Sequence, residues 1–225
     1  MVMTFFRRGD GDSGLDQITA RTVSMVSDAR HSFDLASTAL LSGANVDIVG
    51  EDVRQTDDRI NSAEQELRGQ LVVHVSVQGS SDIGEVLGLI LLIKKIERIG
   101  DQAKNILYLA EDGADLSDAP DLDVLVGYRR TISAMLGEAA DILGAGDEDG
   151  ATALRARSNS LQDELQGHIR SFMHSTEPGS EVVPRAILYR YWKRIVANIA
   201  GVVTTATEPL QHQGYHEDGT VDIDD

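Results

Sequence analysis

The sequence predicts an all-α protein made of two tandem three-helix bundles, with six long antiparallel helices. First, 41% of the 225 residues are apolar, which is enough to form a hydrophobic core in a chain of this length. Second, aromatic residues are scarce, and long stretches show helical rather than alternating periodicity. Third, the apolar pattern of the first half recurs in the second half.

Three helices are expected in the first half. The first spans about residues 15–41 and ends at Gly43, a typical C-terminal stop. The second spans about 46–77, and the third begins near an N-capping aspartate and spans about 82–111. The loop at 112–121, rich in Asp, Gly and Pro, separates the two halves.

The second half repeats this order. Helices are expected at about residues 122–143, 150–174 and 185–207, and the segment 175–184, which ends in proline, is expected to be a loop.

The predicted domains follow from these helices. A flexible N-terminus spans residues 1–14, the first repeat spans 15–112 and the second repeat spans 122–208. The segment 211–225 has almost no apolar content and is expected to be a disordered acidic tail.

The repeat is clearest in the last helix of each half. KKIERIGDQAKNI at residues 94–106 is followed 96 residues later by RYWKRIVANIAGV at residues 190–202. Apolar residues alternate at spacings of four and three in both copies, as in helices that pack at a shallow angle in bundles. Each half is therefore expected to be a three-helix bundle.

The most specific polar pattern is Glu97, Asp101 and Asn105, which lie on one line of the third helix. At 100° per residue, this line points away from the apolar seam, so these side chains are expected to be accessible. Carboxylate oxygens are hard ligands that suit iron, manganese, magnesium or calcium. Because two carboxylates cannot complete a six-coordinate shell, water, another helix or another chain would have to supply ligands.

The same line is also compatible with ordinary helix ion pairs. Lys94 precedes Glu97 by three residues and Lys104 follows Asp101 by three, a spacing that allows weak surface pairs. Gly100 favours a functional interpretation, because glycine inside a helix costs about 1 kcal/mol relative to alanine.

Composition excludes several classes of protein. A net charge of −17 argues against nucleic-acid binding, which needs clustered Lys and Arg. No cysteine is available for disulfides or thiolate metal sites, and no apolar run is long enough to span a membrane. The start of the chain lacks the apolar region of a signal peptide, so we expect a cytoplasmic protein that contacts membranes only peripherally.

The motif ERIGD followed by Asn105, inside a tandem repeat of three-helix bundles, resembles the PhoU family of phosphate-uptake regulators. The segment 57–61, DDRIN, resembles that family's pattern on the second helix, and the similarity covers about residues 15–207. The resemblance implies a non-catalytic, often dimeric adaptor that binds iron, zinc, manganese or magnesium through these acids. It also implies contacts with the ATPase subunit of a phosphate transporter and with a sensor histidine kinase.

The second repeat departs from the family pattern. Lys193 and Ala197 stand where the acids would be, Gly201 replaces the asparagine, and Val196 replaces the glycine of the motif. A lysine repels a metal cation, so at most one metal site per chain is expected.

Two alternatives to a metal-binding adaptor remain. One is a metal-free helical interaction protein, in which Lys193 and the acidic face bind a partner or a second subunit. The other is an accessory subunit of a low-affinity phosphate permease, whose family also contains helical bundles and a start similar to FFRR.

Overall fold

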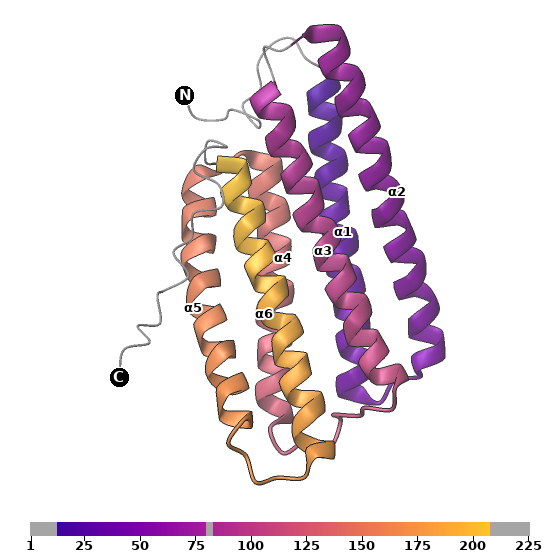
Figure 1. Ribbon diagram of the computed structural model, residues 1–225, viewed down its shortest axis with the longest axis vertical. Coiled ribbons are helices and arrows are strands. Elements are labelled where there is room, and N and C mark those ends of the chain that lie inside the picture. Colours follow the sequence, from indigo (N-terminus) through magenta and orange to yellow (C-terminus); the bar gives the residue numbers. More distant parts are fainter. Residues whose placement is uncertain (1–12, 80–82, 208–225) are drawn as a thin grey trace.

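The computed structural model describes residues 13–79 and 83–207, and this part of the chain forms six α-helices without a β-strand (Figure 1). The prediction of an all-α protein is therefore confirmed. None of the six described helices is long and apolar enough to cross a membrane. The helices are α1 (Ser13–Ser42), α2 (Val46–Gln78), α3 (Ile83–Glu111), α4 (Leu122–Ala145), α5 (Glu148–Phe172) and α6 (Gly179–Thr207).

Local signals set most helix ends. Asn45 caps α2, with its side-chain oxygen accepting hydrogen bonds from the backbone N–H groups of Asp47 and Ile48. Gly146 ends α4 in the left-handed conformation, with a φ of 65° that favours glycine. The first five helices therefore begin and end within about two residues of their predicted positions, as expected for boundaries read from caps.

Helix α6 begins earlier than predicted. It starts at Gly179, whereas the sequence suggested a loop through Pro184 and a helix from about residue 185. Pro184 lies near the start of the helix, where its missing N–H removes only one backbone hydrogen bond and its fixed φ suits the helix. The proline therefore does not end or delay the helix. The predicted tail, 211–225, and most of the predicted flexible N-terminus lie outside the described residues.

The two groups of three helices lie side by side, with α2 and α5 at opposite outer edges (Figure 1). Between them, α1 packs against α4 and α3 packs against α6. The buried apolar side chains form one continuous cluster that includes residues from all six helices. The largest fully buried ones include Trp192, Tyr189 and Phe33. Burial of each large apolar side chain contributes about 1.5–3 kcal/mol, so the two repeats stabilise each other across this shared core.

Helix α3 is enclosed on three sides, because α1, α2 and α6 all pack against it. Helices α2 and α3 pack closely at Gly100, where a Cβ atom would lie 3.0 Å from Cδ1 of Ile60 on α2. This glycine lets α2 approach α3 directly beside the acidic motif.

A pair of glycine substitutions tests this close approach. Gly69→Ala on α2 adds a methyl group that meets no atom within 4 Å, so helix propensity alone should raise the free energy of unfolding by about 0.5–1 kcal/mol. Gly100→Ala should gain less or destabilise, because Ile60 must move. Chemical denaturation measures both values, and equal gains would contradict the packing at Gly100.

Candidate metal centre

The acidic line of α3 faces α2 rather than open solvent. Glu97 is only 8% exposed, and Asp101 and Asn105 are half-buried. The expectation that these side chains point away from their own bundle is therefore wrong for Glu97. The apolar seam marks the side of α3 that enters the shared core, but α2 also covers the flank that carries the acids.

Helix α2 contributes two further carboxylates. Asp57 and Glu64 lie two turns apart on the line of α2 that faces α3, and they are 6% and 7% exposed. We call Asp57, Glu64, Glu97 and Asp101 the carboxylate cluster. Asp57, Glu64 and Glu97 are buried, although aspartate and glutamate are rarely buried unless they are paired.

Two lysines of α3 connect the members of the cluster across the helix boundary. Lys94 Nζ lies 2.8 Å from Glu97 Oε2 and 3.7 Å from Glu64 Oε1. Lys104 Nζ donates a hydrogen bond to Asp57 Oδ2 at 2.5 Å and lies 3.9 Å from Asp101 Oδ1. The ion pairs expected from the sequence spacing are therefore present, and each lysine also reaches a carboxylate of α2.

Other polar groups support the α2 side of the cluster. The Arg68 guanidinium lies 2.8 Å from Glu64 Oε1, and Asn61 donates a hydrogen bond to Asp57 Oδ2 at 3.2 Å. Asn105 lies one turn beyond Asp101 on α3 and does not belong to either lysine pair. The structure thus brings Glu97 and Asp101 together with two acids of α2, and leaves Asn105 at the edge of the site.

The close packing of charges changes their proton affinities. Burial raises the pKa of Asp101 above its ordinary value, and the neighbouring charge of Glu97 raises it further, against the opposing effect of Lys104. Burial alone would lower the pKa of Lys104, but its hydrogen bond and ion pair with Asp57 raise it overall. Four carboxylates, two ammonium groups and the Arg68 guanidinium leave a formal charge of −1 in this region.

Two buried oxygen atoms of the cluster are in ion-pair contact with cationic side chains. Glu97 Oε2 lies 2.8 Å from Lys94 Nζ, and Glu64 Oε1 lies 2.8 Å from the Arg68 guanidinium and 3.7 Å from Lys94 Nζ. These cations compensate the burial of the two carboxylates. Hard, negatively charged oxygens of this kind suit a metal cation. In the part of the chain that the structure describes, no group of three or more His, Cys, Asp or Glu side chains is arranged to hold one.

In the second repeat, the positions that correspond to Glu97, Asp101 and Asn105 are occupied by a lysine, an alanine and a glycine. Lys193 donates a hydrogen bond to Gln166 Oε1 of α5 at 2.7 Å, and Ala197 is exposed. Gly201 lies against Lys95 of α3, since a Cβ atom there would be 2.7 Å from Lys95 Nζ.

The second helix of this repeat has lost its acids too. Superposing the buried residues of α2 and α5 requires a shift of 98 positions, which places Val53 over Ala151 and Leu67 over Leu165. The same shift places Arg155 at the position of Asp57 and Gln162 at that of Glu64. No member of the carboxylate cluster therefore has an acidic counterpart in the second repeat.

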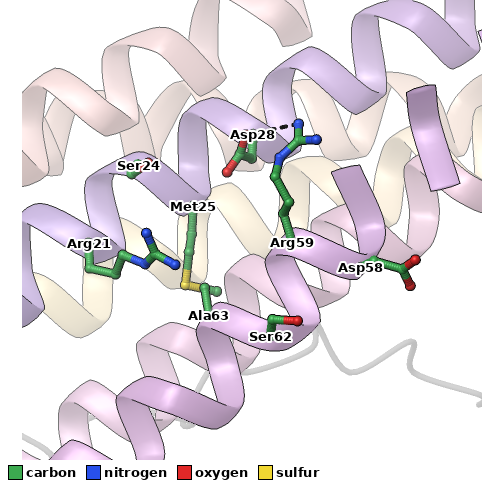
Figure 2. A pocket seen from close by; sticks show the side chains of 8 residues that line it. All are labelled: Arg21, Ser24, Met25, Asp28, Asp58, Arg59, Ser62 and Ala63. Carbon is green, nitrogen blue, oxygen red and sulfur yellow. Dashed lines mark hydrogen bonds and ion pairs between the residues drawn. The ribbon is translucent and has the colours of Figure 1, made fainter. Parts of the chain in front are cut away.

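A separate cavity of about 250 Å³ lies between α1 and α2, on a different flank of α2 (Figure 2). Its charged groups already pair with acids: Arg59 contacts Asp28 at 3.4 Å, and Arg21 contacts Glu66 at 3.3 Å. Asp58 points away from Arg59 in this view. The groups lining this cavity do not converge on a common point, unlike those between α2 and α3.

Asp57 and Glu64 were not identified as site residues from the sequence. The segment 57–61 resembles the family pattern, but no motif in the sequence assigns Glu64 to the site. The sequence signal for Glu64 is its separation of seven residues from Asp57, which places both side chains on one helical line. Which side chains meet across two helices also depends on the relative register of those helices, and the spacing within one helix does not specify that register.

The raised pKa of Asp101 predicts how its substitution affects stability at different pH values. In the folded protein the ionised carboxylate is disfavoured, so stability is lost as the pH rises through the pKa of Asp101. In metal-free protein, Asp101→Asn should therefore raise the melting temperature at neutral pH, with a smaller gain at acidic pH, where wild-type Asp101 is protonated. The exposed Asp58→Asn is the matched control on α2. A gain for Asp101→Asn that grew as the pH fell would contradict this assignment.

Comparison with known proteins agrees with this architecture. Residues 22–110 match the family model of the PhoU domain. The crystal structure of PhoU from Pseudomonas aeruginosa superposes with a TM-score of 0.75, covering 86% of this chain and 95% of that chain at 19% sequence identity. No curated protein matches the sequence. Residues 22–110, which hold the carboxylate cluster, are therefore similar to a PhoU domain, and the six helices together have the fold of that crystal structure.

Proposed function

We propose that this protein is a cytoplasmic regulatory adaptor of phosphate uptake that binds a metal ion at the carboxylate cluster. The PhoU domain at residues 22–110 supports a role in phosphate-uptake regulation, and that family is regulatory rather than enzymatic. The observation that supports the metal assignment is the row of carboxylates between α2 and α3, of which Asp57, Glu64 and Glu97 are buried. Buried negative charge is unfavourable unless cations compensate it.

Glu97 and Asp101 would contribute carboxylate ligands and Asn105 its amide oxygen, with Asp57 and Glu64 of α2 beside them. Water or another chain would have to complete the coordination shell, because among the described residues no three acidic or histidine side chains are arranged around one point. Such hard donors suit iron, manganese or magnesium, and zinc also accepts carboxylate ligands. A metal at this position would join α2 to α3, so its contribution would be to stabilise one arrangement of these helices. One site per chain is proposed, because the second repeat lacks the acids.

The proposed partners are proteins of phosphate transport and signalling. They are the ATPase subunit or permease of a phosphate transporter, a sensor histidine kinase, and a second copy of this chain in a homodimer. Binding of nucleic acid is disfavoured by the net charge of −17, since phosphate groups would be repelled. Contact with a membrane would be peripheral, through the transporter.

One observation favours the alternative of a metal-free interaction protein. Both ends of the carboxylate cluster are already paired with lysines, so the site is partly neutralised without a metal. In this alternative, the protein is an adaptor or an accessory subunit of a low-affinity phosphate permease. A complex with the ATPase or permease that survives chelation but weakens with added salt would favour this alternative.

Metal analysis tests the proposed site. Wild-type protein, treated with chelator and then incubated with Mn²⁺, Fe²⁺, Zn²⁺ or Mg²⁺, should retain about one equivalent of metal after gel filtration, measured by elemental analysis. Glu64→Gln with Glu97→Gln removes two charges but keeps the side-chain shape, and should reduce the bound metal at least tenfold. Asp58→Asn, an exposed acid on the same helix, is the control and should change nothing. Unchanged metal content in the double variant would remove this site from the proposal.

A further inference from the structure

Unpaired cations gather at the boundary between α3 and α6. Most arginines and lysines of this acidic chain contact a carboxylate, as Arg21, Arg54 and Lys104 do. Among the described residues, four other cations on α3 and α6 form neither an ion pair nor a side-chain hydrogen bond with one another or with the rest of this part of the chain: Lys95, Arg98, Arg190 and Arg194. We call these four side chains the basic row.

The basic row follows one line of α6. Helices α3 and α6 lie side by side (Figure 1). Arg190, Arg194 and Gly201 share a line of α6, because spacings of four and seven residues are close to whole turns. Lys95 of α3 reaches this line, since a Cβ atom at Gly201 would lie 2.7 Å from Lys95 Nζ. Arg98 lies one turn after Lys95 on α3. The row therefore extends over about 16 Å of the boundary.

No nearby carboxylate of these two helices neutralises the row. The segment 182–207 of α6 contains no aspartate or glutamate. On α3, Glu97 and Asp101 pair with Lys94 and Lys104 beside α2. Burial lowers the pKa of Lys95, and the neighbouring positive charge of Arg98 lowers it further. The row is thus a place of uncompensated positive charge in a chain whose net charge is −17.

The row is accessible to a ligand. Arg98, Arg190 and Arg194 are exposed, and Lys95 is half-buried. Ala197, which lies between Arg194 and Gly201, is also exposed and has only a methyl group as its side chain. A negatively charged segment could therefore lie along the boundary without displacing a bulky side chain.

The segment that follows α6 has the opposite charge. Residues 208–225, which we call the acidic segment, contain no lysine or arginine and six acids: Glu208, Glu217, Asp218, Asp222, Asp224 and Asp225. Five of these acids lie within the last nine residues.

The acidic segment begins close enough to reach the row. Thr207 ends α6, and Gly201 and Arg190 lie about 9 Å and 26 Å from it along the helix. The nine residues 208–216, which precede the group of five acids, can span at most about 30 Å. These acids can therefore meet every cation of the row without a change in the helices.

We propose that the acidic segment, residues 208–225, binds the basic row of its own chain. Individual exposed ion pairs contribute at most about 1 kcal/mol, but several act together here. The covalent connection also holds the acids at a high effective concentration near the row. A partner that used an acidic segment to bind this surface would first have to displace the chain's own. This inference does not depend on the proposed metal site.

A spin label on the acidic segment tests the contact. The chain has no cysteine, so Thr220→Cys gives a single attachment point for a nitroxide. At low salt, the nitroxide should cause a greater loss of NMR amide signal at residues 95–98 and 190–201 than at residues 158–169 of α5. This part of α5 lies at the same level along α6, as the contact between Lys193 and Gln166 shows, and therefore controls for reach.

A neutral acidic segment is the matched control. Glu217→Gln with Asp218→Asn, Asp222→Asn, Asp224→Asn and Asp225→Asn keeps the length and the label but removes five charges. The loss of signal should then be the same on both sides of α6. Arg98→Glu with Arg194→Glu should have this effect as well, with circular dichroism to check the fold. In about 1 M NaCl, where the Debye length is about 3 Å, the unsubstituted segment should also lose its preference for the row.

Three outcomes would overturn the proposal. In the first, the charged and neutral segments cause equal loss of signal at the row. In the second, the loss arises only from a label on another molecule, in a mixture of spin-labelled protein and ¹⁵N-labelled protein, so the row is an interface between copies. In the third, inorganic phosphate shifts the signals of the row at the same concentration whether the segment is charged or neutral, so the segment does not occupy the row.

Discussion

The enclosure of α3 by three neighbouring helices is the constraint on which the rest of this structure depends. With α1, α2 and α6 packed around it, most of the circumference of α3 is covered, and an exposed line remains at residues such as Leu91 and Arg98. A charged side chain such as Glu97 must then be compensated by nearby groups, because burial of an unpaired charge is costly. Lys94 provides that compensation, and Gly100 allows α2 to come close enough to share it.

The two repeats meet the same constraint in different ways. In the first repeat the space between the second and third helices contains ion pairs between acids and lysines. In the second repeat Lys193 bonds to the neutral amide of Gln166, and aromatic rings occupy the space among α4, α5 and α6. His168 stacks on Tyr189 with ring centroids 4.7 Å apart, and the Tyr128 hydroxyl contacts His168 Nε2 at 2.9 Å. Aromatic packing and hydrogen bonds therefore take the place of the acid–lysine ion pairs, so the second repeat supports the first without duplicating its chemistry.

The lysines meet this electrostatic constraint along the boundary between α2 and α3. Lys94 lies between Glu64 and Glu97, and Lys104 lies between Asp57 and Asp101, so each lysine joins the two helices. Each ammonium group places positive charge among carboxylates that would otherwise repel one another. The packing of α2 on α3 therefore depends on charge as well as on apolar contact.

Local patterns in the sequence determined the helices, the repeat and the positions of Glu97 and Asp101. Apolar spacing and capping residues such as Asn45 act within a few residues, so they can be recognised without the fold. The tertiary structure decided which helix lies beside the acids, and so made Asp57 and Glu64 part of the site. It also decided that Pro184 lies within α6. A helical wheel specifies the direction of a side chain but not the neighbour in that direction, since the neighbour depends on long-range packing of the whole core.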